Sequence, residues 1–184
     1  GFGDINAHAL YEEFRGVISA RPEGPLTLPD YLALGPRQSL LAPSEREVSH
    51  ALFVRYCKWL DDAALFDLNL VAHGLRPLAS PAYDFIVVDE VQDLTMVMLT
   101  LVLARLKDPS QFLLCGDSNQ IVHPNFFSWA AVRSLFWNGL AGDVAQRQAL
   151  HILQANFRNT KAVTQLANSL LKIKQARFGS VDRE

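Results

Sequence analysis

Two short apolar runs that end in acidic residues restrict the possible folds of this chain more than any other feature. The first run, YDFIVV at residues 83–88, is followed at once by Asp89 and Glu90. The second run, FLLCGD at residues 112–117, ends in a Gly-Asp pair. Short β-branched runs are typical of strands that are buried on both faces of a parallel sheet. A helical pattern follows each run, so we expect an α/β fold in which helices pack on a parallel sheet.

The remaining segments divide the chain near residue 80. The pattern before this point is helical, and three-residue and four-residue spacings predict helices at residues 5–20, 43–62 and 65–75. Ser44 and Glu47 have capping-box spacing at the second helix, and a Pro- and Gly-rich loop at 21–30 precedes it. After residue 80 we expect helices at 94–108, 127–140 and 160–174 and a third strand at 151–159. Arg105 and Lys107 suit the last turn of the first of these helices, and Thr160 suits the N-cap of the last.

The bulk composition is that of a globular protein. The 184 residues are 49% hydrophobic and 20% charged, with a net charge of −2, so no overall basic charge indicates nucleic-acid binding. The two cysteines, Cys57 and Cys115, lack metal-ligand spacing and favour a reducing compartment. No apolar run has membrane-spanning length, and residues 1–10 lack the pattern of a signal peptide. We therefore expect a cytoplasmic protein, although a truncated chain would hide any targeting segment.

The first acidic cluster consists of Asp89, Glu90, Gln92 and Asp93. In parallel sheets, ligands bind beyond the carboxyl ends of the strands, which is where this cluster falls. A carboxylate at such a strand end can hold Mg²⁺ beside nucleotide phosphates, and a second one can deprotonate an attacking water. The alternative is a strand end with solvated acids that favour the start of the next helix. The presence of Gln92 and Asp93 beside the acid pair favours the functional interpretation.

Two further stretches carry candidate functional residues. Gln120 follows Asp117 by three residues and can sense a phosphate or a water, although an ordinary Gly-Asp-Ser-Asn turn explains the same residues. Phe127 and Trp129 come next and either fill a core or offer stacking faces for unpaired bases. Arg158 lies between the predicted third strand and the last helix, where an arginine can reach a γ-phosphate, although most single arginines are surface residues.

In this order and at these distances, the three stretches resemble the UvrD/Rep-type DNA helicases of superfamily 1. VVDEVQDLT at residues 87–95 resembles motif II of that family, and LLCGDSNQI at 113–121 resembles motif III. LQANFRNTKAVTQLANSLL at 153–171 resembles motif IV. The resemblance covers about residues 83–171 and implies a partial RecA-like P-loop NTPase sheet. It implies two regions, a helical accessory subdomain of the 1B type at 1–80 and part of motor domain 1A at 81–184, which runs into motif IV at the start of the second motor domain.

The resemblance also implies roles for single residues. Asp89 would bind Mg²⁺, Glu90 would be the general base, Gln120 would couple the γ-phosphate to the DNA site, and Arg158 would contact that phosphate. The residues expected to bind the cofactors ATP and Mg²⁺ are Asp89, Gln92, Asp93 and Asp117. Trp129 is the first choice for stacking on single-stranded DNA and Phe127 the second, because VHPNFFSW replaces the family's usual aromatic pattern here.

A P-loop is absent from the sequence. The family's ATPase needs a Gly-rich loop that ends in Gly-Lys-Ser/Thr, and no Gly in these 184 residues is followed by Lys. We therefore expect an internal fragment of an ATP-dependent helicase or translocase acting on single-stranded DNA, with RNA not excluded. The rest of the helicase chain would supply the P-loop and the second motor domain, and the isolated fragment would bind no nucleotide and hydrolyse no ATP. The alternative is a degenerate, non-motor helicase-like module that binds nucleic acid or a protein partner.

Overall fold

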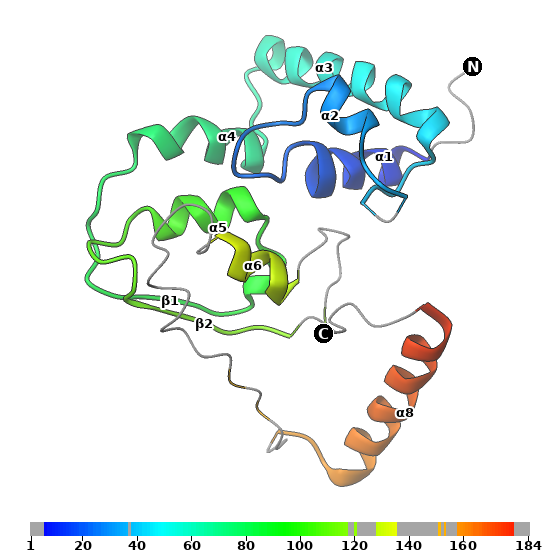
Figure 1. Cartoon of the computed structure of the whole chain (residues 1–184), viewed down its shortest axis with the longest axis vertical. Helices are drawn as coiled ribbons and strands as arrows, with labels where there is room; N and C mark the ends of the chain where they lie inside the picture. The colour runs from blue at the N-terminus through cyan, green and yellow to red at the C-terminus, as the bar shows by residue number, and fades with distance from the viewer. Residues whose placement is uncertain are drawn as a thin grey trace. The chain divides into compact units, whose positions relative to one another are not determined.

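The computed structural model describes residues 6–36, 38–117, 120, 128–135, 151, 153 and 158–178. The chain divides into two compact units, residues 1–127 and 128–184, and each unit is described by itself. The first unit contains helices and a small sheet, and the second contains two helices among its described residues (Figure 1). None of the described helices is long and apolar enough to cross a membrane.

Among the described residues, four α-helices form the N-terminal part of the first unit (Figure 1), and three of them correspond to the stretches that the sequence predicts as helical. They are α1 (Ala7–Glu13), which continues as a π-helical segment (Phe14–Ile18), α2 (Leu28–Leu32), α3 (Arg46–Ala63) and α4 (Leu68–Leu75). Their apolar faces meet in a core that α1, α2 and α3 share, and its buried members are Phe14, Val17, Ile18, Leu26, Tyr31 and Phe53. The helical periodicity of the sequence is therefore confirmed, and α2 begins inside the stretch that was predicted as loop.

The prediction that Ser44 and Glu47 form a capping box at α3 is wrong, because the side-chain contact involves Glu45. Helix α3 is preceded by a 3-10 turn (Pro43–Glu45), and the Glu45 carboxylate accepts a hydrogen bond from the Ala42 amide at 2.9 Å. Pro43 has no amide hydrogen and fits the first turn, so the helical region begins earlier than the pair of Ser44 and Glu47 suggested. One half of a capping box therefore forms, through Glu45 and not Glu47, because the Ala42 side chain has no acceptor.

The strands β1 (Ile86–Val88) and β2 (Phe112–Leu114) pair in parallel, with Val87 opposite Leu113. Helix α5 (Met96–Leu103) connects them and lies on one side of the pair (Figure 1). This confirms an α/β arrangement with a parallel sheet. The expectation that both faces of the strands are buried is wrong, because Val87 is 59% exposed and Leu113 is 51% exposed. Side chains alternate along a strand, so these two partners share the uncovered face, and Val88 points to the covered one.

The helix between the strands is shorter than predicted. Helix α5 ends at Leu103, so the predicted placement of Arg105 and Lys107 in its last turn is wrong. Lys107 instead forms an ion pair with Asp84, with 2.8 Å between Nζ and Oδ1, and Arg105 lies over the ring of Tyr83. These contacts belong to the entrance of β1, so the two basic residues hold the loop after α5 against the chain that leads into the strand.

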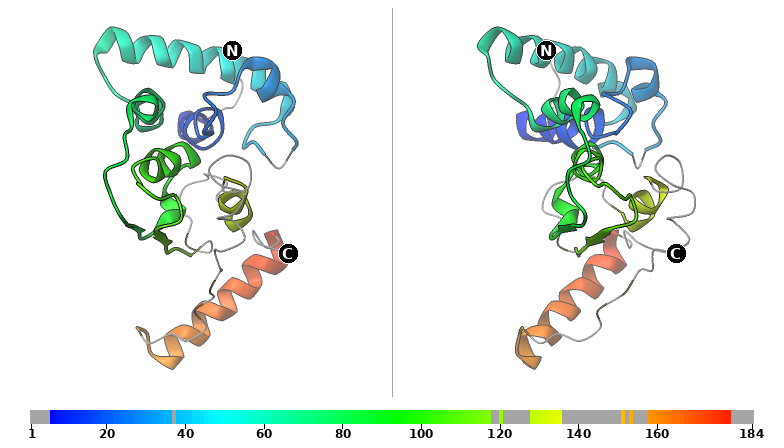
Figure 2. Two further views of the ribbon diagram at one scale, coloured as in Figure 1. Left: turned by 60° about the vertical axis from the view of Figure 1, so that its left-hand side comes forward. Right: turned by 90° about the vertical axis from the view of Figure 1, so that its left-hand side faces the viewer.

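Helices α4 and α5 pack side by side in both views of Figure 2. This contact joins the helical part to the sheet across residue 80, and the predicted division into regions 1–80 and 81–184 stays a prediction. A backbone hydrogen bond from the Val97 amide to the Ala20 carbonyl, at 2.9 Å, adds a second connection. The helix that follows the acidic cluster is therefore fixed to the N-terminal helices of the same unit.

The second unit contains α6 (Trp129–Leu135) and α8 (Lys161–Phe178). The predicted helix at 160–174 is confirmed, and the Thr160 hydroxyl accepts from the Val163 amide at 3.4 Å, as an N-cap does. The predicted helix at 127–140 is confirmed at 129–135, and its remaining residues lie outside the described ones. The predicted third strand is wrong for its described residues, His151, Leu153, Arg158 and Asn159, none of which lies in a strand.

Candidate functional site

The chain turns sharply at the carboxyl end of β1, where Asp89 and Glu90 follow Val88. Glu90 has φ 52° and ψ 41°, a left-handed conformation that residues other than glycine adopt rarely. Its amide donates to the Asp89 carboxylate, with 3.0 Å between N and Oδ1. A 3-10 turn (Val91–Asp93) follows immediately. Both acidic side chains are exposed, so the turn presents two neighbouring carboxylates at the edge of the sheet.

Backbone hydrogen bonds fasten this turn to the end of β2. The Cys115 amide donates to the Val88 carbonyl at 2.8 Å, and the Val91 amide donates to the Cys115 carbonyl at 2.9 Å. The ladder of backbone hydrogen bonds therefore continues beyond the end of each strand. The sequence predicted that the two acidic stretches lie at the same edge of the sheet, and these bonds bring Asp89 and Glu90 next to the Gly116-Asp117 stretch.

The side-chain amide of Gln92 bridges the two stretches. Its Nε2 donates to the Glu90 carboxylate, with 2.7 Å to Oε2, and its Oε1 accepts from the Asp117 amide at 3.0 Å. Gln92 is only 2% exposed, so the bridge lies below the surface on which the Glu90 carboxylate is presented. Both polar groups of this amide therefore have partners within the protein.

Gly116 leaves the space that the Gln92 bridge occupies. A Cβ atom at position 116 would lie 2.5 Å from Gln92 Oε1 and 2.9 Å from a methyl carbon of Val91. Any other residue at 116 would therefore force the Gln92 amide to move. The sequence pattern indicated Gly116 only as part of a turn. The signal for its role was a glycine close to the end of a strand, where another segment of the backbone or its side chains can approach closely.

Gln120 is joined to the same network through Asp117. Its side-chain Nε2 donates to the Asp117 carboxylate at 2.9 Å, and its backbone amide donates to the Asp117 carbonyl at 3.0 Å. The predicted site residues Glu90, Gln92, Asp117 and Gln120 are thus connected by hydrogen bonds. Asp93 is exposed next to them, and its backbone amide donates to the Glu90 carbonyl at 2.9 Å.

Two predicted site residues lie in the second unit. Trp129 is the first residue of α6 and is half-buried, and Arg158 is exposed in the turn before α8. Both lie in the second unit, which is described separately from the acidic turn. Phe127 lies outside the described residues.

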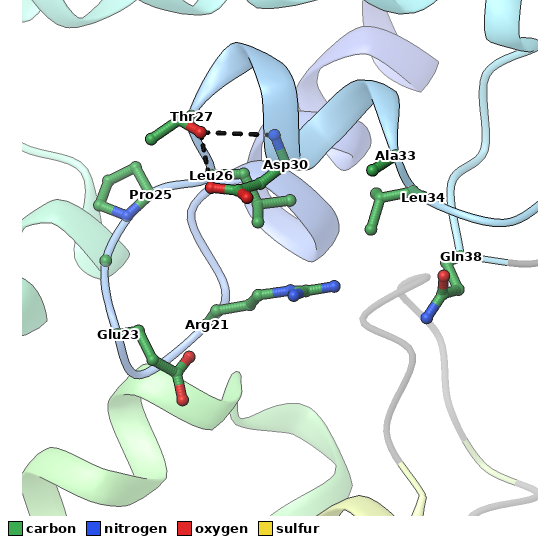
Figure 3. A pocket seen from close by; sticks show the side chains of 10 residues that line it. Arg21, Glu23, Pro25, Leu26, Thr27, Asp30, Ala33, Leu34 and Gln38 are labelled. Atoms are coloured by element: carbon green, nitrogen blue, oxygen red, sulfur yellow. Dashed lines mark hydrogen bonds between the residues drawn. The ribbon is translucent and has the colours of Figure 1, made fainter.

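An open cavity of about 590 Å³ lies away from the acidic turn, between the loop that follows the π-helical segment and α2 (Figure 3). Arg21 extends across it toward Gln38, and the Thr27 hydroxyl caps α2 by accepting from the Asp30 amide. None of the predicted site residues lines this cavity. It carries charges of both signs, and we assign it no role in the chemistry of the acidic turn.

Comparison with known proteins identifies a family for this chain. The family model of the viral superfamily 1 RNA helicase core domain matches residues 38–170. The chain belongs to this family. The family supports a superfamily 1 helicase-like region, and it does not single out the UvrD/Rep-type proteins that the motifs resemble.

One curated relative is a human protein named TPR and ankyrin repeat-containing protein 1. It is 26% identical to this chain over 171 residues, which cover 85% of this chain and 6% of the relative. The chain thus spans only a small part of that protein's length. No solved structure matches the chain.

Proposed function

We propose that this chain forms part of an ATP-dependent helicase or translocase that acts on single-stranded nucleic acid. The observation that carries the proposal is the arrangement of the Glu90 carboxylate. It is presented at the carboxyl end of β1 and is hydrogen-bonded through Gln92 to the stretch that holds Asp117 and Gln120. Family membership supports the same class of protein.

In this proposal Glu90 is the general base. Its carboxylate accepts the proton of a water that attacks the γ-phosphate of ATP, and the bond from that phosphorus to the bridging oxygen of ADP breaks. One oxygen of Glu90 accepts from Gln92, and this contact leaves the other available to the water.

Asp89 is the residue that would hold Mg²⁺. The described residues contain no group of three or more His, Cys, Asp or Glu side chains suited to a metal ion. A magnesium site of the nucleotide-dependent kind takes one or two carboxylates and completes its shell with water and phosphate oxygens. When bound, Mg²⁺ would neutralise charge on the phosphates. Asp89 is exposed, and the Glu90 amide orients its carboxylate through Oδ1.

Five further residues have roles in the proposal. Gln120 would sense the γ-phosphate, Arg158 would contact that phosphate and stabilise its charge, and Trp129 would stack on a base. Asp93 and Asp117 would contribute to the nucleotide site through their carboxylates. The P-loop would lie elsewhere in the polypeptide, since none of the glycines in these 184 residues precedes a lysine.

The nucleic acid is a separate question from the motor activity. The motif resemblance favours DNA, and the description of the matching family names RNA helicases. An assay with single strands of both kinds, matched in length and sequence, separates the two.

The test is ATP hydrolysis by the longest form of the protein that contains this chain, with and without single-stranded DNA or RNA. Glu90→Gln keeps the size of the side chain and removes the base, and we expect kcat to fall at least about 100-fold. Glu47→Gln, which changes an exposed acid on α3, is the control and should retain the wild-type rate. Absence of any stimulation by either nucleic acid in the wild-type protein would contradict the proposal.

The second candidate is a helicase-like module that binds single-stranded nucleic acid or a protein partner without hydrolysing ATP. The specific observation in its favour is the absence of a Gly-Lys pair from the sequence. The same assay separates the candidates, because such a module would hydrolyse no ATP with or without a single strand.

A further inference from the structure

We infer that Gln92 is a positioning residue. It connects the Glu90 carboxylate to the backbone just after β2, so that a movement of Gln120 changes the position of the Glu90 carboxylate. The inference rests on the proposed function for the role of Glu90. It goes beyond that function because Gln92 would position the general base Glu90 and would not bind the nucleotide.

The bridge fixes both ends of the Gln92 side chain. Its amide nitrogen reaches the Glu90 carboxylate at 2.7 Å and its oxygen meets the Asp117 amide at 3.0 Å. Rotation of the amide by half a turn would place an oxygen against the carboxylate and an NH₂ group against the Asp117 N–H. Because the side chain is buried, each lost partner would leave an unsatisfied polar group away from water. Only one orientation of the amide therefore satisfies both ends.

A general base at Glu90 requires a contact that fixes the position of its carboxylate. Glu90 is exposed, and among the described residues its carboxylate accepts a side-chain hydrogen bond from Gln92. A general base must lie within hydrogen-bonding reach of the proton that it accepts, and small displacements of a catalytic group reduce rates strongly. The contact with Gln92 restricts the rotation of the Glu90 side chain and so determines where its second oxygen points.

The other end of the bridge leads to Gln120. Gln92 Oε1 accepts from the backbone amide of Asp117, and the carboxylate of Asp117 accepts from Gln120 Nε2 at 2.9 Å. Gln120, Asp117, Gln92 and Glu90 thus form one continuous hydrogen-bonded chain. A ligand that moves Gln120 would shift Asp117, and the bridge would carry that shift to the base.

The first test measures the bridge in the 184-residue chain by NMR-detected amide hydrogen exchange at Asp117. Gln92→Met keeps the volume of the side chain and removes both hydrogen bonds, and we expect the Asp117 amide to exchange about fivefold faster or more. Gln92→Glu keeps an acceptor for that amide and places a second carboxylate against that of Glu90, so it tests the loss of the donor in the activity measurement. Unchanged exchange in Gln92→Met overturns the inference.

A second variant breaks the bridge without altering any of its members. Gly116→Ala places a methyl group where Gln92 Oε1 lies, so we expect the same acceleration of Asp117 exchange as in Gln92→Met. Gly74→Ala is the matched control, because a Cβ atom at that position meets nothing within 4 Å, and its Asp117 exchange should equal that of the wild type. Equal exchange in the two alanine variants contradicts the inference.

The final measurement separates positioning from a merely structural role. In the longest form of the protein, we expect Gln92→Met, Gln92→Glu and Gly116→Ala to lower kcat for ATP about tenfold to 100-fold, with KM within about twofold of wild type. Wild-type kcat in all three variants of an active protein overturns the inference. An inactive wild-type protein counts against the proposed function instead, and the exchange results then decide whether the bridge exists.

Discussion

Glu90 combines a left-handed backbone with a carboxylate that the fold holds in place. A residue with a side chain loses about 1–2 kcal/mol in this conformation relative to the right-handed one. The surrounding bonds offset this cost, because the Val91 amide donates to Cys115 and the Gln92 amide donates to the Glu90 side chain. Glycine would relieve the strain and remove the carboxylate. Strained backbone conformations are common at functional sites, so the strain at Glu90, which carries a carboxylate, agrees with the role that we propose for it.

A second buried carboxylate, Glu13, serves the architecture of the N-terminal helices. Its oxygens accept hydrogen bonds from the Tyr31 hydroxyl at 2.7 Å, from the Ser39 hydroxyl at 2.5 Å and from the Leu40 amide at 2.8 Å. Both Glu13 and Tyr31 are fully buried. This cluster fastens the chain between α2 and α3 onto α1.

This cluster leads to a prediction for alkaline pH. Burial, together with the nearby Glu13 carboxylate, raises the pKa of the Tyr31 phenol above its ordinary value. The unfolded chain releases this proton near pH 10, whereas the native state keeps it. The stability that Tyr31 contributes is therefore complete below about pH 10 and is lost as the pH rises above that value. Urea unfolding at several pH values between 9 and 11.5 should show this loss.

The variant Tyr31→Phe provides the comparison. It should be less stable than wild type at neutral pH, because the Glu13 carboxylate loses one donor, and its stability should decline less steeply above pH 10. Tyr11→Phe removes an exposed phenol and serves as the control for the loss of a tyrosine. Equal slopes for wild type and Tyr31→Phe would show that Tyr31 does not carry the alkaline loss.

At the scale of elements, the C-terminal end of α3 supports a stabilising substitution. Ala64 follows the last residue of the helix with φ 51° and ψ 42°, and the Leu65 amide donates to the Leu60 carbonyl at 2.9 Å, as in a Schellman turn. Glycine adopts this conformation without the penalty that alanine has. We expect Ala64→Gly to raise the free energy of unfolding by about 1 kcal/mol, as measured by urea denaturation.

The adjacent position gives the matched control. Ala63 is the last helical residue of α3, where glycine costs about 0.5–1 kcal/mol relative to alanine. Ala63→Gly should therefore be destabilising, although it makes the same chemical change one residue earlier. Destabilisation by both variants would mean that the left-handed turn does not persist in solution.

The elements that the sequence predicted best are those with strong periodicity. The helices α3 and α8 and the parallel strands follow from apolar spacing alone, because burial of one face determines them. The ends of elements were harder to predict. Helix α5 stops before Arg105 and Lys107 because these residues make tertiary contacts with Tyr83 and Asp84, which no local pattern reveals. Exposure of Val87 and Leu113 likewise depends on what covers the sheet.

The candidate site shows the same division between local and tertiary information. The acids at the ends of β1 and β2 were predicted to meet, since carboxyl ends of parallel strands share an edge. The bridge made by Gln92 was not predicted, because it depends on a left-handed turn at Glu90 and on the close approach of Gly116. The assignment of Gln92 to nucleotide binding stays a prediction, and its amide already has two protein partners.

Within the first unit, a buried polar cluster joins the N-terminal helices to the helix that follows the acidic turn. The Asn69 amide on α4 donates to the Arg15 carbonyl at 2.8 Å and to the Ser19 hydroxyl at 2.9 Å. Its oxygen accepts from the hydroxyl of Thr95, the N-cap residue of α5, at 2.6 Å. Asn69, Ser19 and Thr95 are each about 1% exposed, so none of these groups can exchange its partner for water.

The Asn69 cluster yields a prediction about the unit as a whole. Asn69→Ala removes the partners of three polar groups at once, and we expect the free energy of unfolding to fall by about 2–3 kcal/mol in urea denaturation. Thr95→Val keeps the side-chain shape and removes one hydroxyl, so its loss should be smaller, about 1 kcal/mol. Gln165→Ala removes an exposed amide on α8 and should change stability by less than about 0.5 kcal/mol. A loss for Asn69→Ala no larger than that of Gln165→Ala would mean that the cluster does not hold α4 and α5 together. The predicted loss would instead mean that the helices before residue 80 and the start of α5 unfold together. Helix α5, which follows the Glu90 turn, would then be fixed to the N-terminal core.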